Sequence, residues 1–136
     1  MSAAFEVKPP SVYAAFGFKA GLFTVPDPAQ AIHAVLSGAA DLYTTWPEMP
    51  GCLVLDGARG TEDAEAQQAA TCHRAAFRAA LNARLRTLED PMADLRADAT
   101  LAAIMGLSAA ARAGLGREDL RRIAIAFADG IGRLGQ

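Results

Sequence analysis

The spacing of the apolar residues constrains this sequence more than any other feature. From Asp27 onward, apolar side chains recur every three or four residues, and no stretch alternates between apolar and polar residues as a half-buried strand would. Such spacing places the apolar residues on one side of a helix. The sequence therefore predicts an all-α fold, a bundle of helices.

Prolines and capping residues indicate where the helices begin and end. Asp27 is a suitable N-cap because Pro28 fits the first helical position and Gln30 the third. Pro47 and Pro91 are expected to end helices. The longer helices are expected over residues 28–46, 62–90, 98–113 and 117–134.

The apolar stripes of two of these helices predict core residues. In the first helix the stripe consists of Ile32, Val35, Leu36, Ala39, Tyr43 and Trp46. In the last helix it consists of Leu120, Ile123, Phe127, Ile131 and Leu134.

Composition limits the class of protein. With 52% hydrophobic and 21% charged residues, a chain of 136 residues is expected to form one packed core. A net charge of −2 excludes a uniformly basic nucleic-acid binder but allows a local basic patch. No apolar run approaches the roughly 18 residues that span a bilayer, and the N-terminus does not resemble a signal peptide. We therefore expect a cytoplasmic protein whose Cys52 and Cys72 are reduced thiols.

The segment VKPPSVYAAFGFKAGLF, Val7 to Phe23, begins with two prolines and contains the only two lysines of the chain, Lys8 and Lys19. The prolines are tolerated only in the first turn of a helix, and Gly17 is suited to its end. Spacing alone favours Lys8 and Lys19 as solvated surface charges and Tyr13 as a half-buried core residue.

Four segments together resemble the TetR family of transcriptional regulators. The first matches the family's YxxFGxKxxLF-type signature at Tyr13, Phe16, Gly17, Lys19, Leu22 and Phe23. It departs from that signature at Phe18, where a small polar residue is more usual. The other three are similar to segments of the family's regulatory domain and occur in the expected order: PGCLVLDGA, IMGLSAAARAG and REDLRRIAIAFADGI.

This resemblance implies a ligand-responsive transcriptional regulator, a repressor, that binds double-stranded operator DNA as a homodimer. Residues 1–24 would form a partial helix-turn-helix segment with the recognition helix, and residues 25–136 the ligand-binding and dimerisation domain. A recognition helix offers its first turn to the major groove and is positioned by phosphate contacts on either side. The implied DNA-binding residues are Lys8, Pro9, Pro10, Ser11, Tyr13 and Lys19.

The sequence departs from the family on both sides of this helix. Only MSAAFE precedes Val7, where the family has two earlier helices, and TVPDPAQ follows Phe23, where the family has a long connecting helix. A second function is therefore kept open. In that alternative, the chain is a truncated helical module that binds a small molecule or dimerises without binding DNA.

The resemblance also implies a dimer interface and an effector site in the regulatory domain. The last two helices would pair across a two-fold axis through Ala103, Gly106, Leu107, Ala110, Leu120, Phe127 and Ile131. A small apolar or amphipathic effector would bind within the bundle, against Trp46, Met49, Cys52, Cys72, His73, Phe77 and Met105. For the residues of the dimer interface and of the effector site alike, the alternative is that they pack in the core of the single chain.

Catalysis has little support in the sequence. The two histidines, His33 and His73, are far apart and have no partnered carboxylate, so a catalytic triad is not expected. GARG lacks the lysine and the length of a phosphate-binding loop, and the acids of TEDAEA fit a helix start better than a metal site. We expect neither an enzyme nor a bound cofactor or metal.

Overall fold

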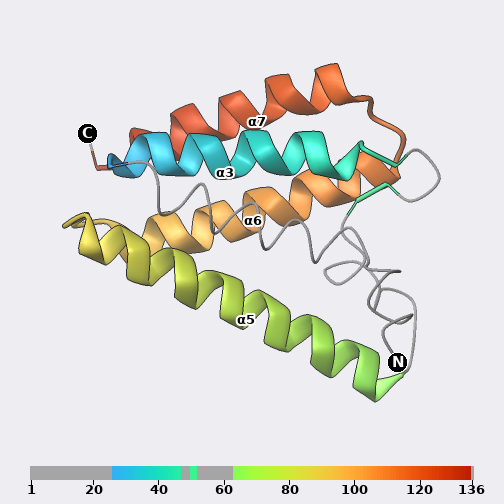
Figure 1. The fold of residues 1–136 in the computed structure, drawn as a ribbon, viewed down its shortest axis with the longest axis horizontal. Coiled ribbons are helices and arrows are strands. Elements are labelled where there is room, and N and C mark those ends of the chain that lie inside the picture. The colour runs from blue at the N-terminus through green and yellow to red at the C-terminus, as the bar shows by residue number, and fades with distance from the viewer. Residues whose placement is uncertain (1–25, 47–49, 52–62, 136) are drawn as a thin grey trace, which may run out of the picture.

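The computed structural model describes residues 26–46, 50–51 and 63–135, and within these residues the fold is all-α, as the sequence predicts. Its four helices are α3 (Pro28–Tyr43), α5 (Ala64–Thr87), α6 (Ala93–Arg112) and α7 (Arg117–Gly132) (Figure 1). Among the described helices, none is both long enough and apolar enough to cross a bilayer.

Helix α6 is the centre of the arrangement because it packs against each of the other three helices. Helix α3 also lies along α7, and α3, α6 and α7 form the compact part of the bundle (Figure 1). Helix α5 packs mainly against α6 and diverges from it toward the α5 N-terminus (Figure 1).

The N-terminus of α3 agrees with the sequence prediction. The Asp27 carboxylate accepts a hydrogen bond from the Gln30 backbone N–H at 3.1 Å, and Pro28 occupies the first helical position. The helix ends at Tyr43, three residues earlier than expected, because the hydroxyls of Thr44 and Thr45 bond to the carbonyls of the last turn. Trp46 therefore lies beyond the helix.

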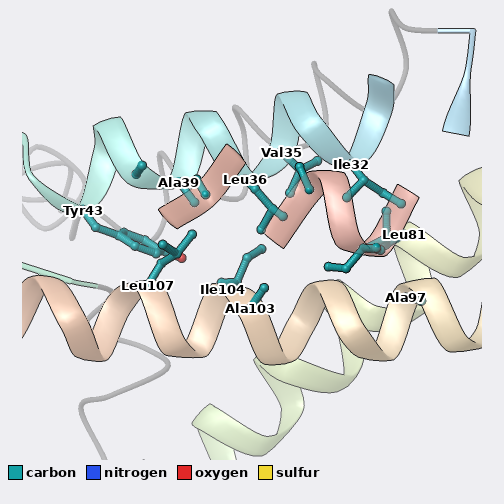
Figure 2. Packing of buried hydrophobic residues seen from close by; sticks show 14 of the residues in the cluster. Ile32, Val35, Leu36, Ala39, Tyr43, Leu81, Ala97, Ala103, Ile104 and Leu107 are labelled. Carbon is teal, nitrogen blue, oxygen red and sulfur yellow. The ribbon is translucent and has the colours of Figure 1, made fainter. Parts of the chain in front are cut away.

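The core stripe of α3 is confirmed for its helical members. Ile32, Val35, Leu36, Ala39 and Tyr43 are all buried. Figure 2 shows them directed toward side chains of the neighbouring helices, namely Leu81, Ala97, Ala103, Ile104 and Leu107.

The stripe predicted for α7 is wrong in part. The buried residues are Leu120, Ala124, Ala128 and Ile131, whereas Phe127 is 40% exposed. Small alanine side chains allow α7 to approach α3 closely, so the helix turns its alanines inward. The bulkier Phe127 is left at the rim. Spacing of large apolar residues does not reveal a buried stripe made of alanine.

The start of α6 also differs from the prediction, which placed it at Asp98. Helix α5 ends in a Schellman motif, in which the Glu89 N–H bonds to the Arg86 carbonyl at 2.9 Å and the Asp90 N–H to the Leu85 carbonyl at 3.0 Å. Glu89 has a φ of 59°, a conformation usually given to glycine. The Asp90 carboxylate then accepts from the N–H of Met92, the N-cap of the next helix, at 2.9 Å, and α6 starts at Ala93.

A buried arginine closes this end of the bundle. Arg96 forms an ion pair with the Asp90 carboxylate and donates to the carbonyls of Ile131 at 3.1 Å, Gly132 at 3.2 Å and Leu134 at 2.9 Å. The carbonyls of Ile131 and Gly132 belong to the last turn of α7, where backbone acceptors lack partners within the helix, and Leu134 lies just beyond its end. Arg96 therefore ties the α5–α6 turn to the end of α7. We name this cluster of five residues the closed end.

Candidate ligand-binding site

The opposite end of the bundle contains a cavity of about 690 Å³ where α3 and α6 end and α7 begins. The described residues that line it are Thr44, Trp46, Pro50, Ala111, Arg112, Gly114, Leu115, Gly116 and Arg117. We name this region the open end. Its volume lies within the range of about 300–1,000 Å³ typical of small-molecule sites.

One wall of the cavity depends on Gly51. The Gly51 N–H donates to the Tyr43 carbonyl at 3.0 Å, which brings the chain after α3 back against α6. Gly51 has a φ of +87°, and a Cβ atom there would lie 2.7 Å from Arg112 Cγ and 2.9 Å from the Ser108 carbonyl oxygen. Only glycine fits both the conformation and the space. Pro50 is thereby held beside the stem of Arg112.

The opposite wall is the turn between α6 and α7. Gly114, with a φ of 109°, donates to the Ala111 carbonyl at 3.1 Å, and Leu115 donates to the Ala110 carbonyl at 3.1 Å. This Schellman motif reverses the chain within a few residues. Gly116 then serves as the N-cap of α7 without a side-chain capping bond. The turn therefore presents an apolar leucine and an open helix N-terminus to the cavity.

The charged side chains among the described lining residues of the open end are those of Arg112 and Arg117. Arg117 donates to Thr44 Oγ1 at 3.0 Å and to the Asp41 carbonyl at 3.1 Å, both of them neutral acceptors. The Asp41 carboxylate is instead bonded to Arg121 at 2.5 Å, which raises the pKa of Arg121. Within the described part of the chain, the Arg112 guanidinium has no hydrogen-bond or ion-pair partner. None of the described lining residues is acidic.

Such a site can bind but offers little for catalysis. Its described lining provides guanidinium and hydroxyl groups and apolar surface, without a histidine, cysteine or carboxylate that would act as a base or a nucleophile. No group of three or more potential metal ligands occurs within the described residues.

Of the predicted ligand-binding residues, Trp46 lines this cavity. His73 and Phe77 are half-buried on α5, Cys72 is exposed, and Met105 is 38% exposed on α6; none of these four lines it. Burial and the neighbouring Arg74 lower the pKa of His73, which favours its neutral form. Met49 and Cys52 lie outside the described residues.

The other predicted contact residues lie partly outside and partly within the described residues. The residues expected to bind DNA, namely Lys8, Pro9, Pro10, Ser11, Tyr13 and Lys19, all lie outside the described residues. The expected dimer residues that are buried in the core of the single chain are Ala103, Leu107, Leu120 and Ile131. Those that retain exposed surface are Gly106, Ala110 and Phe127.

Sequence reasoning missed Arg112, Arg117 and Gly51. The available signal was the run RAGLGR, in which two arginines flank a glycine-rich turn between helices. That run predicts a helix end and a helix start, but only the fold shows that the end of α3 reaches the same place (Figure 1).

The comparisons with known proteins add no relative of this chain: no protein-family model, curated protein or solved structure matches it.

Proposed function

We propose that this chain is a ligand-responsive transcriptional regulator similar to the TetR family, a repressor that binds operator DNA as a homodimer. The observation that carries the proposal is the segment Val7–Phe23, with its tyrosine, glycine and lysine at the family's spacing. The all-α fold of the described residues is compatible with it. Effector binding in the bundle would shift the population of dimers whose recognition helices stand about 34 Å apart, the distance between successive major grooves.

A surface of α6 supports the dimer. Asp94 and Asp98 of α6 pair with Arg78 of α5, so that side of the helix is used within the chain. A different side carries uncharged, mostly small residues at helical spacing, all of them exposed or half-buried: Leu95, Ala99, Ala102, Gly106 and Ala110. Small residues allow a second helix to approach closely.

A matching surface runs along α7. Arg117 and Arg121 bond to α3 from one side of this helix. The uncharged residues Ile123, Ala126, Phe127 and Gly130 lie on another side and retain exposed surface, next to the ion pair of Asp119 and Arg122. Because α6 and α7 pack against each other, we infer that the two surfaces form one outer face. A second copy would cover the outer face by a two-fold, self-complementary contact.

The dimer is tested by Gly106→Arg, with Gly38→Arg as its matched control. Both glycines are helical, and a Cβ atom at either would meet nothing within 4 Å, so both variants should fold. Arginine at Gly106 places a charge in the centre of the outer face, whereas Gly38 lies on α3. We expect sedimentation equilibrium to give a dimer for the wild type and Gly38→Arg, and a monomer for Gly106→Arg. A monomeric wild type contradicts the dimer.

DNA binding is tested by Lys19→Ala in the intact protein. If Lys19 contacts a phosphate, its loss weakens binding to every duplex and lowers the slope of log affinity against log salt by about one. Fluorescence anisotropy with labelled duplex DNA at several salt concentrations measures both. An unchanged slope refutes the assignment of Lys19. A dimer that binds no duplex at low salt favours the alternative, a helical binding or dimerisation module.

A further inference from the structure

We propose that the open end binds a small organic carboxylate with an apolar body, and that Arg112 is the residue that recognises the carboxylate. This inference deepens the proposed function, because it gives the effector a chemical class and a position. Only the regulatory effect of ligand binding rests on the proposed function; the binding itself does not depend on it.

The charge of the cavity points to an anion. Arg112 projects a guanidinium without an acceptor among the described residues, and no described lining residue is acidic. Arg117 is bonded only to neutral oxygens, so its charge also remains without a carboxylate partner in the described part of the chain. A guanidinium offers paired donors that match the two oxygens of a carboxylate.

The position of Arg112 is fixed by its stem rather than by its charged group. Its Cγ atom lies over Gly51, where a Cβ atom would come within 2.7 Å. Packing of the stem against Gly51 restrains the side chain at the cavity wall and leaves the guanidinium to solvent. A partly restrained donor loses less conformational entropy when it binds a ligand.

The remaining walls favour a ligand with an apolar body over a simple inorganic anion. Trp46, Pro50, Ala111 and Leu115 supply apolar surface around a volume of about 690 Å³. An inorganic ion would leave this surface in contact with water, whereas an alkyl or aryl group would cover it. Gly116 and Arg117, at the start of α7, also line the cavity, and the first turn of this helix carries Glu118 and Asp119 as well.

A purely structural role for Arg112 makes a different prediction. As the last residue of α6, Arg112 also interacts favourably with the negative end of the helix dipole. That role explains an arginine at this position, but it gives no preference among ligands. The two interpretations are therefore separated by ligand binding.

The test uses Trp46, the only tryptophan of the chain, as an optical probe in the cavity wall. Octanoate, 1-octanol and octylammonium each contain eight carbon atoms in an unbranched chain, and their head groups are negative, neutral and positive, respectively. We expect octanoate to change Trp46 fluorescence saturably and to bind about tenfold more tightly than 1-octanol, because hydrogen bonds to a carboxylate are charge-assisted and those to a hydroxyl are neutral. Octylammonium should bind most weakly.

The variant Arg112→Gln should remove the preference for octanoate and leave the affinity for 1-octanol unchanged. Arg133→Gln is the matched control, because Arg133 is an exposed arginine at the other end of α7 and should leave the preference intact. Urea unfolding of both variants verifies that they remain folded.

Three results would overturn the site: no saturable response to octanoate, equal affinity for the three ligands, or a preference that persists in Arg112→Gln. Binding seen by calorimetry without a change in Trp46 fluorescence would also overturn it, since the ligand would then lie elsewhere. If the protein binds octanoate but no duplex DNA, the ligand site would be supported. Only the proposal that the protein is a DNA-binding regulator would then be refuted.

Discussion

The two ends of α6 each carry an arginine, and the two side chains have opposite surroundings. Arg96 at the closed end is 8% exposed, and its donors are taken up by the Asp90 carboxylate and by three carbonyls at or just beyond the end of α7. Arg112 at the open end is exposed and has no acceptor among the described residues. The same residue type therefore completes the fold at one end and remains available to a ligand at the other.

The difference follows from the cost of burying a charge. A guanidinium that leaves water is tolerated only if a carboxylate and further acceptors replace the lost hydration, and the closed end provides all of them. An exposed guanidinium keeps its water and needs no partner. Stability should therefore depend on Arg96, whereas recognition should depend on Arg112.

The largest expected effect is the loss of Arg96. Arg96→Met leaves the Asp90 carboxylate buried without its partner and removes the donors to the α7 carbonyls, so it should lower the free energy of unfolding by about 4 kcal/mol. Arg112→Met should change it by less than about 0.5 kcal/mol, as an exposed surface substitution does. Urea unfolding followed by circular dichroism measures both.

If Arg96→Met is too unstable to purify, the double variant with Asp90→Asn keeps the comparison measurable. It removes the buried charge together with its partner, so it should be more stable than Arg96→Met alone. Equal losses for Arg96→Met and Arg112→Met would contradict the distinction between the closed and open ends.

A smaller effect is expected at the open end, where Gly51 holds the cavity wall. Gly51→Ala strains a backbone with φ of +87° and places Cβ 2.9 Å from the Ser108 carbonyl oxygen. We expect a loss of about 2 kcal/mol from strain and overpacking. Gly38→Ala, a helical position with nothing within 4 Å of the added Cβ, should instead gain up to about 1 kcal/mol. Thermal unfolding compares the two, and a stable Gly51→Ala would show that the wall tolerates a side chain.

The smallest effect concerns Asp94, an exposed acid near the closed end. Hydrogen bonds from Asn82 and Arg86, at 2.6 Å and 3.0 Å, lower the pKa of Asp94 below its ordinary value of 3.8. Because the folded pKa is the lower one, the contribution is present above pH 3.8 and is lost as the pH falls through the folded pKa. The urea midpoint should therefore fall slightly less between pH 6 and pH 3 in Asp94→Asn than in the wild type. An identical fall would assign no stabilising role to this exposed cluster.

The sequence predicted the features that depend on residues close to one another in the chain, such as helix starts and apolar stripes. Asp27 and Pro28 define the start of α3, and the large apolar residues of its stripe are buried as expected. The α7 stripe was misplaced because Ala124 and Ala128 carry little weight in a hydropathy pattern, although they form the contact with α3. The start of α6 was missed because Asp90 acts as an N-terminal acceptor across Pro91.

The candidate site was less predictable than the fold. Trp46 was expected to bind a ligand and lines the cavity, but Arg112 and Gly51 are brought together from positions 61 residues apart (112 − 51). A contact of this kind depends on where the end of α3 meets the end of α6. The spacing of apolar residues within either helix does not predict where the two helix ends meet.

The network around Arg96 also bears on how long the folded chain persists. Its hydrogen bonds to the end of α7 join residues 35, 36 and 38 positions apart. Closing such loops costs chain entropy, and interactions that are absent from the transition state govern the rate of unfolding. We therefore expect that loss of these hydrogen bonds raises the rate of unfolding, and so shortens the lifetime of the native state, while the rate of folding stays nearly unchanged.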